Sequence, residues 1–469
     1  MVGLPVDIAV VGAGPAGAHL ASLGAAAGNS VLLFDPKGAW EKPCGGGVTA
    51  RGLREYSFLT ASTDHPHKTI DRLLVVSSGG KRVSVKLRYP FAVYSRAILN
   101  DIVLQRALSA GAQFVKEKVV SFEQLSDGWL LKDGSGASWK VRYLVGADGA
   151  ASVVRRHLIG MLPVRDTAIA MGYNVFFAAG SEQASGDNGT ATQATANAFR
   201  ESSTVVVEFI KDFSGYLWAF PRVGSINFGI ASKLREQTSQ MLRGKLDDFV
   251  TSYCRRIGLS AQSSDFFAAK IPILDKSTWR DLRVSGDGWA LIGDAAGFVD
   301  PITGEGIYYA LKSADLLFRS MTSSGLFAAE KMQTSAAPGG QEAFDVNAST
   351  GLVNELDVSA APPRRGRSKV SSAFPGAPLA TASEPDWTVV SARYDRLWRT
   401  EFGSELERAS RMLLRFYRGR FLGYDFNDAM VMFSRLHPGI RDTMARAVVG
   451  EQSYLSLKRD LVLSLFRPF

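Results

Sequence analysis

The strongest constraint on the fold is a glycine-rich stretch close to the N-terminus, at residues 10–17. An apolar run at 8–11 leads into it, and an alanine- and leucine-rich stretch continues after it to residue 27. A second apolar run, 31–34, ends at Asp35. This order predicts a strand, a tight turn, a helix and a second strand that is followed by an acidic residue.

Each glycine of this stretch has a distinct physical task. Gly12 permits the tight turn, Gly14 lets the backbone approach a pyrophosphate, and Gly17 allows the helix to pack closely on the strand. The N-terminus of the helix offers free N–H groups to phosphate. Asp35 follows Gly17 by 18 residues, where an acid can meet a ribose hydroxyl. Together these features favour a dinucleotide site over a chance glycine turn.

Length and composition bound the rest of the interpretation. The 469 residues have room for two or three domains. The formal charge of +9 suits an anionic partner, but no compact Lys/Arg run resembles a nucleic-acid arm, so we expect no nucleic-acid partner. The two cysteines, Cys44 and Cys254, imply no disulfide framework and fit a reducing compartment.

The sequence has neither a signal-peptide pattern nor an apolar run of 18 or more residues. We therefore expect a cytoplasmic protein without a transmembrane helix. The five histidines show no metal-ligand spacing, and no nucleophile–base–acid triad is apparent. We expect no metal.

Two further segments place carboxylates at the ends of predicted strands. Asp148, followed by Gly149, comes after an apolar strand at 143–146. Gly293 and Asp294 come after another strand, in a predicted strand–turn–helix. Ligands of α/β sheets bind at these carboxyl edges. A further helix is expected to open at residues 304–307, where its N–H groups can bind polar cofactor atoms.

Other residues leave two interpretations open. Three glycines follow Cys44, which predicts either space for a flat ligand or a flexible surface loop. Arg96 begins a predicted helix over 94–111 and is either solvated or in contact with a cofactor. Tyr216, Trp218 and Phe220 share one face of a predicted strand, as part of the core or as an apolar wall for a hydrophobic substrate.

Composition changes along the rest of the chain. Residues 165–270 are β-rich, with a polar loop predicted at 181–195. Residues 334–384 are rich in Ala, Ser, Gly and Pro, which predicts a disordered insertion. Helical periodicity returns at 391–469 with many arginines. Its amphipathic end, 454–469, is either a packed terminal helix or a contact with the inner membrane surface.

The glycine stretch, the Asp148–Gly149 turn and the segment from Gly293 to Gly306 together resemble the FAD-dependent oxidoreductases of the hydroxylase-like glutathione-reductase fold. The resemblance implies an α/β fold class: a three-layer ββα Rossmann-like FAD-binding domain, an inserted β-rich α+β substrate domain and a helical C-terminal region. The expected FAD-binding parts are 1–69, 91–164 and 271–330. The expected substrate-domain parts are 70–90 and 165–270, with a low-complexity insertion at 331–388 and a helical region at 389–469.

The resemblance also implies roles for particular residues. The glycine stretch would hold the FAD pyrophosphate, Asp35 the adenosine ribose and Asp294 the ribitol chain, while Arg96 would contact the cofactor. The expected cofactor-binding residues are Gly12, Gly14, Pro15, Ala16, Gly17, Asp35, Pro36, Cys44, Gly45, Gly46, Arg96, Asp148, Gly149, Gly293, Asp294, Pro301, Gly304, Glu305, Gly306 and Ile307.

A narrower resemblance rests on residues 41–47 and 216–221, which look like the geranylgeranyl reductase family. It implies reduction of C=C bonds in a polyprenyl chain by hydride from reduced flavin, with electrons from NADPH or ferredoxin. The substrate headgroup stays open among lipid, quinone and chlorophyll precursor. Tyr216, Trp218 and Phe220 would line the substrate tunnel. Cys44 would lie near the reacting centre as a proton donor or redox-sensitive gate, unless it is only a small filler.

Two other functions remain open. A flavin monooxygenase or halogenase shares the fold, although a halogenase would carry a Trp-x-Trp-x-Ile-Pro motif and a site lysine, and here Tyr216 and Phe220 replace the first Trp and the Ile. A flavin-binding accessory protein of a membrane complex is the non-catalytic alternative. We expect a monomer.

Overall fold

The glycine stretch directly follows a central strand of the first of two large sheets. In the computed structural model, which describes residues 6–176, 203–258, 263–325, 327 and 386–464, β1 (Val6–Val11) pairs in parallel with β2 (Val31–Phe34). On its other side β1 pairs in parallel with β9 (Ser138–Gly146). The strand order is β15-β16-β9-β1-β2-β6, and the remaining bounds are β6 (Gln113–Val115), β15 (Ser285–Gly286) and β16 (Trp289–Leu291).

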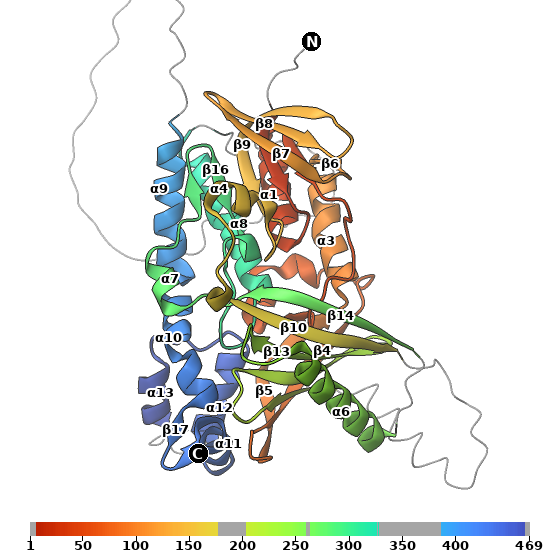
Figure 1. The fold of residues 1–469 in the computed structure, drawn as a ribbon, viewed down its shortest axis with the longest axis vertical. Coiled ribbons are helices and arrows are strands. Elements are labelled where there is room, and N and C mark those ends of the chain that lie inside the picture. Colours follow the sequence, from red (N-terminus) through yellow and green to blue (C-terminus); the bar gives the residue numbers. More distant parts are fainter. Residues whose placement is uncertain (1–5, 177–202, 259–262, 326, 328–385, 465–469) are drawn as a thin grey trace, which may run out of the picture. The chain divides into compact units, whose positions relative to one another are not determined.

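Helices and a second layer of strands cover this sheet. Helix α1 (Pro15–Ala26) packs against α3 (Arg96–Ser109) and α8 (Ile307–Thr322). The buried residues of α1 include several small ones, glycine and alanine, which allow this close packing. Strands β7 (Val119–Leu125) and β8 (Gly128–Asp133) form an antiparallel meander with β9 (Figure 1). This Rossmann-like arrangement, with the β-rich second sheet and the helical C-terminal region, confirms the predicted fold class.

The second sheet is mostly antiparallel and collects strands from distant parts of the chain. Its order is β14-β10-β13-β12-β11-β4-β5-β3, and only β11 and β4 pair in parallel. The bounds are β3 (Gly47–Val48), β4 (His67–Val76), β5 (Arg82–Tyr94), β10 (Thr167–Phe176), β11 (Thr204–Phe209), β12 (Gly215–Arg222), β13 (Ser225–Lys233) and β14 (Ser263–Pro272). Through β3, this sheet reaches the glycines that follow Cys44.

Helix α6 (Ser239–Ile257) packs on one part of the second sheet, against β10 and β13 (Figure 1). Its buried residues Leu242, Leu246, Phe249 and Tyr253 recur at helical spacing, and the Thr238 side chain caps its N-terminus. The predicted polar loop at 181–195 lies outside the described residues.

The C-terminal region is helical from Trp387 onward. Helix α9 (Trp387–Trp398) continues through a π-helical turn (Arg399–Gly403) into α10 (Ser404–Arg418). A short hairpin of β17 (Arg420–Phe421) and β18 (Tyr424–Asp425) precedes α11 (Phe426–Leu436), α12 (Pro438–Val448) and α13 (Leu457–Ser464). The amphipathic end therefore contributes a helix that starts at Leu457, not at Tyr454. The predicted insertion at 331–388 lies outside the described residues up to 385.

One local prediction was wrong. The segment after β16 does not form a strand–turn–helix, because only the short 3-10 turn Gly293–Ala295 follows the strand. The next helix is α8, which begins at Ile307 with Gly306 as its N-cap. The other short helices are α2 (Ala50–Glu55), α4 (Val153–Ile159) and α7 (Lys276–Arg280), with 3-10 turns at Ser57–Leu59 and Val164–Asp166. Among the described residues, no helix has the length and apolar character needed to cross a bilayer.

Candidate functional site

The glycine stretch has the geometry of a phosphate-binding turn. Gly12 adopts φ +106°, and a Cβ on Gly17 would collide with the carbonyl oxygen of Gly12, so both positions require glycine. A Cβ on Gly14, in contrast, would meet no atom within 4 Å. The first helical hydrogen bond runs from Ala18 N to Gly14 O, so the N–H groups that precede Ala18 are available to a ligand. This open, glycine-lined cradle fits the pyrophosphate of the expected FAD.

Asp35 lies at the carboxyl end of β2, beside this cradle. One carboxylate oxygen accepts a hydrogen bond from Ala13 N at 2.9 Å, and the other accepts from Lys37 N at 2.8 Å and Gly38 N at 3.0 Å. Asp35 thus ties the glycine turn to the turn after β2, which contains Pro36. Its position at the strand end is where the ribose was expected.

Asp294 lies at the other side of the site and is paired with a residue that the sequence did not indicate. Lys42 Nζ donates to Asp294 Oδ2 at 3.0 Å, which joins the segment before Cys44 to the turn after β16. Both residues line the same large cavity as Pro15 and the 301–307 loop. The structure therefore brings the first and third predicted cofactor segments together around one cavity.

The backbone after Cys44 is held by a buried arginine. Arg222, at the end of β12, donates to the carbonyl oxygens of Cys44 at 2.7 Å and Gly45 at 3.3 Å. Gly46 adopts φ +82°, and a Cβ there would collide with Tyr94 O. These contacts make the segment an ordered part of the cavity wall, not a flexible surface loop.

Glu41 orients both Arg222 and the start of α3. Its carboxylate accepts from Arg222 Nη1 at 2.7 Å, from Ser95 Oγ at 2.5 Å and from Arg96 N at 3.2 Å. Burial would raise the pKa of Glu41, but Arg222 and these hydrogen bonds outweigh burial and lower it. Glu41 is therefore held as a carboxylate that links the two sheets.

Arg96 is not solvated, so that interpretation was wrong. The side chain is 4% exposed, lines the large cavity and donates from Nη2 to Asn100 Oδ1 at 3.0 Å. Its Nε has no hydrogen-bond partner among the described residues. An unpaired buried donor in the cavity wall fits contact with an anionic or polar ligand.

Asp148 lies against the glycine turn, since a Cβ on Gly12 would collide with its Cα. Its carboxylate accepts from Ser152 Oγ and from Val153 N at 2.6 Å, so it caps the first turn of α4. Gly149 adopts φ +81° in the turn between β9 and α4. Neither residue is among those that line the large cavity. A Cβ on Gly149 would, however, lie 3.7 Å from Nζ of Lys42, which does line it, so this turn lies between the glycine turn and the cavity wall.

The cavity encloses about 860 Å3 between the two sheets and the C-terminal helices. Pro15, the glycines after Cys44, Asp294 and the 301–307 loop line it, together with residues of α10 to α13, whereas Gly12, Gly14, Ala16, Gly17 and Asp35 are not among the lining residues. Most of its wall is aliphatic or aromatic, and Tyr216, Trp218 and Phe220 all contribute to it. The Phe220 ring packs against Gly45 and Gly47, where any side chain would collide with it or crowd it. An extended apolar molecule suits such a space.

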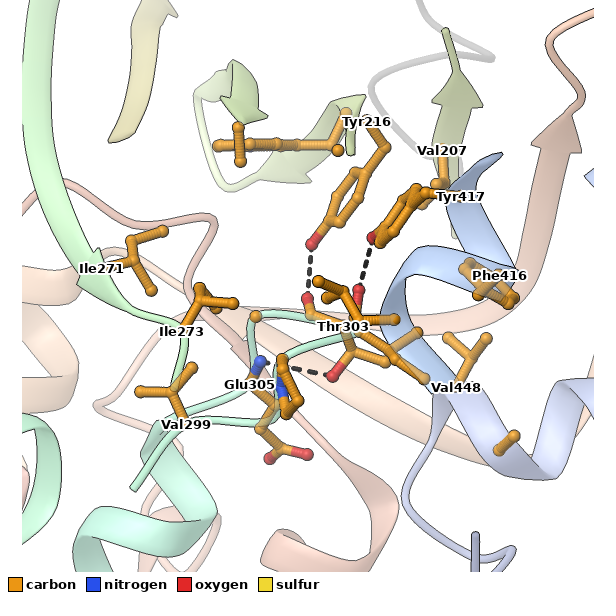
Figure 2. A pocket seen from close by; sticks show the side chains of 18 of the residues that line it. Val207, Tyr216, Ile271, Ile273, Val299, Thr303, Glu305, Phe416, Tyr417 and Val448 are labelled. Atoms are coloured by element: carbon orange, nitrogen blue, oxygen red, sulfur yellow. Dashed lines mark hydrogen bonds between the residues drawn. The ribbon is translucent and has the colours of Figure 1, made fainter. Parts of the chain in front are cut away.

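Tyrosines hold the 300–305 loop in the cavity wall. Figure 2 shows the Tyr216 hydroxyl donating to Thr303 O and the Tyr417 hydroxyl donating to Ile302 O, the latter at 2.6 Å. Tyr454 donates to the buried carboxylate of Asp300 at 2.8 Å. Tyr417 of α10 and Tyr454, in the turn before α13, come from the C-terminal region, so segments distant in sequence position this loop. Sequence patterns did not indicate either of them.

Glu305 stands between the large cavity and a smaller polar one. Figure 2 places its carboxylate on the far side of the loop from the Tyr216 and Tyr417 hydroxyls. Burial raises the pKa of Glu305 to about 7, although Arg51 and the Thr49 hydroxyl lower it. The polar cavity, about 250 Å3, is lined by residues that include Arg51 and Glu305. Glu305 can therefore exchange a proton near neutral pH.

The chain is similar to known proteins in sequence and in fold. A family model described as FAD binding domain matches residues 5–324. The menaquinone reductase of Mycobacterium tuberculosis is 30% identical over 335 residues, which cover 68% of this chain and 77% of that protein.

Two solved structures share the fold across nearly the whole chain. A geranylgeranyl bacteriochlorophyll reductase-like protein from Thermoplasma acidophilum has a TM-score of 0.66 at 16% identity, over 98% of this chain and 99% of that one. The flavin-dependent brominase Bmp2 has a TM-score of 0.59 at 15% identity, over 99% of this chain and 100% of that one.

Proposed function

Since the chain belongs to the family of proteins with an FAD binding domain, we propose that this FAD-dependent oxidoreductase reduces C=C bonds of a polyprenyl chain. The chain would be carried on a lipid, a quinone or a chlorophyll precursor. The observation that supports this most is the apolar cavity, which is lined both by Pro15, next to the glycine cradle, and by the C-terminal helices. An isolated alkene does not react with a side-chain nucleophile, so its reduction requires a hydride. Bound FAD, once reduced, supplies that hydride to the alkene.

The residues of this chain would bind and orient both partners. The cradle at Gly12 to Gly17 would hold the pyrophosphate, and Asp294 with Lys42 would hold the polar chain of the cofactor. Trp218 and Phe220 would position the prenyl chain by apolar contact. The same aromatic wall excludes water from the reacting bond.

Reduction of one C=C bond adds a hydride to one carbon and a proton to the other. The Cys44 thiol borders the cavity beside Gly45 and is the proposed proton donor. NADPH or ferredoxin is the proposed source of the two electrons.

The relative in Mycobacterium tuberculosis is named a menaquinone reductase, which favours a prenylated quinone among the possible headgroups. The structural neighbour from Thermoplasma acidophilum is named as geranylgeranyl reductase-like, which is consistent with a prenyl chain.

A flavin-dependent monooxygenase or halogenase is the second candidate. It is favoured by the similarity to the brominase Bmp2 and by the presence of Lys42 in the cavity wall. Lys42, however, is ion-paired with Asp294 at 3.0 Å, and Tyr216 and Phe220 depart from the halogenase motif. A flavin-binding accessory protein would bind FAD and turn over neither class of substrate.

Anaerobic turnover distinguishes these functions. Dithionite-reduced, FAD-loaded protein is freed of excess dithionite and mixed with a prenylated quinone without oxygen. After the reaction is stopped, the products are reoxidised to the quinone form and weighed by mass spectrometry, because reduction of the quinone ring adds the same mass as saturation of one C=C bond. Reduction predicts a mass gain of about two daltons for each bond saturated, because one hydride and one proton are added. Products that form only with O2 would refute the reductase. Binding of FAD without turnover of prenyl or aromatic substrates would favour the accessory protein.

The control variant is Gly14→Val. Its Cβ enters open space, so the fold should be unchanged, but the side chain would fill the cradle for the pyrophosphate. Loss of both FAD and turnover, with an unchanged circular dichroism spectrum, would assign the activity to the bound cofactor. Cells with and without the protein should differ in their prenyl lipids and quinones by the same mass increments.

A further inference from the structure

Exposed apolar side chains are concentrated in the C-terminal region. Of the 17 large apolar residues that are exposed in the described part of the chain, eight lie between residues 414 and 463. Among these are Phe421, Leu422 and Tyr424 of the β17–β18 hairpin and Val462 of α13. We call these four residues, together with Arg415, Arg420 and Lys458, the mouth surface. Apolar patches of this kind mark interaction sites.

The large cavity reaches solvent at the mouth surface. Phe421 and Val462 both line the cavity, and they are 47% and 50% exposed. Arg415, Arg420 and Lys458 line it as well, and all three are exposed. An apolar molecule can therefore pass between the cavity and whatever covers this surface.

The hairpin presents its apolar side chains outward at its tip. Phe421 is paired with Tyr424 across the two strands, so their side chains share a face. Leu422 and Gly423 form the turn with φ +51° and +81°. Such turns favour Asn or Gly, yet position 422 holds a leucine that is 72% exposed. Of the three non-glycine residues with positive φ in the described chain, Leu422 alone is apolar. Contacts within the described fold do not account for this choice.

The free charges beside these apolar residues are basic, since the neighbouring carboxylates of Asp425 and Asp460 are paired with Arg420 and Arg459. Arg415 and Lys458 form no ion pair with any carboxylate of the described residues, and Arg420 reaches Asp425 only at 4.0 Å. The acidic residues of the cavity wall are Asp294 and Glu305, and both are only half-exposed. Apolar tips flanked by basic residues, two of which form no ion pair among the described residues, match the layered chemistry of an anionic membrane surface.

We propose that the mouth surface docks on an anionic lipid bilayer. Phe421 and Leu422 insert among the lipid headgroups, and Arg415, Arg420 and Lys458 contact the lipid phosphates. The bilayer fits better than a second copy of the chain, because a symmetric dimer through this surface would bring the two basic clusters together. The inference deepens the proposed function, since a water-insoluble prenyl chain would then enter the cavity directly from the membrane.

Vesicle cosedimentation tests the docking without any substrate. FAD-saturated protein is mixed with vesicles of phosphatidylcholine alone or with 30% phosphatidylglycerol, and the partition coefficient is measured. We expect partitioning to be at least tenfold stronger on the anionic vesicles and to weaken with added salt, because each basic residue near such a surface contributes roughly fivefold. Equal or absent partitioning on the two vesicles would overturn the proposal.

Matched variants separate this surface from the rest of the protein. Leu422→Asp should lower partitioning on anionic vesicles about tenfold or more. Met161→Asp makes the same change at a residue that is 71% exposed and does not line the cavity, and it should have less than a twofold effect. Leu422→Asn should also weaken binding while its backbone preference suits the turn, which excludes misfolding as the cause. Equal effects of the two aspartate variants would overturn the proposal.

Two further results distinguish the alternatives. A dimer seen by sedimentation velocity without vesicles, and dissociated by Leu422→Asp, would assign the mouth surface to a second copy and overturn membrane docking. Vesicle binding by a protein that reduces no prenyl substrate would refute only the proposed function. Turnover of detergent-dispersed substrate without vesicle binding would refute only the docking.

Discussion

Replacing Glu305 by glutamine should change how the stability of the protein depends on pH. Burial, with a smaller effect of the nearby Asp300, raises the pKa of this carboxyl from its usual 4.5 to about 7, against the opposing effects of Arg51 and Thr49. Between these two pH values the folded protein holds a proton that the unfolded chain has already lost. The free energy of unfolding must therefore fall as the pH rises from 4.5 to 7.

The size of this effect follows from the two pKa values. Each pH unit of difference corresponds to about 1.4 kcal/mol, so a pKa raised from 4.5 to about 7 makes the ionised carboxyl unfavourable by about 3 kcal/mol above pH 7. Glutamine has nearly the same shape and cannot ionise. The free energy of unfolding of Glu305→Gln, measured relative to that of the natural protein, should therefore increase by about 3 kcal/mol between pH 4.5 and pH 8.

Urea unfolding at several pH values between 4.5 and 8, with FAD saturating throughout, measures this difference. Any change in the hydrogen bond from the Thr49 hydroxyl shifts the stability of Glu305→Gln by an amount that does not depend on pH. The slope of the difference is therefore the readout. Stability curves for Glu305→Gln and the natural protein that run parallel over this pH range would refute the reasoning.

Glu41→Gln is the control with the opposite sign. The pKa of Glu41 is lowered, so its contribution to stability is fully present above pH 4.5 and is lost only as the pH falls through the folded-state value. Glu41→Gln should destabilise the protein by an amount that stays constant from pH 5 to 8. If the difference in stability between Glu41→Gln and the natural protein changed with pH over this range, replacement of a carboxylate by an amide would itself alter the pH dependence of stability.

Three other substitutions have expected outcomes. Gly46→Ala should lose bound FAD, measured by flavin absorbance, and several kcal/mol of stability, measured by urea unfolding. The control Gly80→Ala should lose only about 1–2 kcal/mol of stability, because Gly80 has φ +78° but no atom lies near its Cβ. Arg222→Lys should lower the free energy of unfolding in urea by about 3 kcal/mol, because one ammonium group cannot reproduce the forked hydrogen bonds to the Cys44 loop. A decrease below about 1 kcal/mol would contradict this. Cys44→Ala should lower turnover of a prenylated quinone at least about 100-fold if the thiol donates the proton, and a change of less than about threefold would leave it a filler.

The local pattern predicted the first sheet well because its signals are contiguous. The glycine turn, the strand before it and Asp35 follow one another within 30 residues, and backbone sterics at Gly12 and Gly17 admit few alternatives. Period-two alternation likewise predicted that Tyr216, Trp218 and Phe220 share a face, and all three line the cavity.

Local pattern misled where a short segment depended on distant partners. Asp294 follows a strand, which suggested a helix after it, yet only a 3-10 turn forms there. The following loop is instead held by Tyr216, Tyr417 and the Tyr454–Asp300 hydrogen bond. No pattern within the loop itself could have indicated these contacts.

The sequence by itself determined the dinucleotide cradle, because a phosphate-binding turn needs glycines at close, regular spacing. Only the tertiary structure decided what surrounds it. Lys42 meets Asp294 across 252 residues, and Arg222 reaches the Cys44 loop across 178. Side chains so far apart leave no periodic signal, since their meeting depends on how two sheets and the C-terminal helices pack. That packing also created the apolar cavity and opened it at the mouth surface.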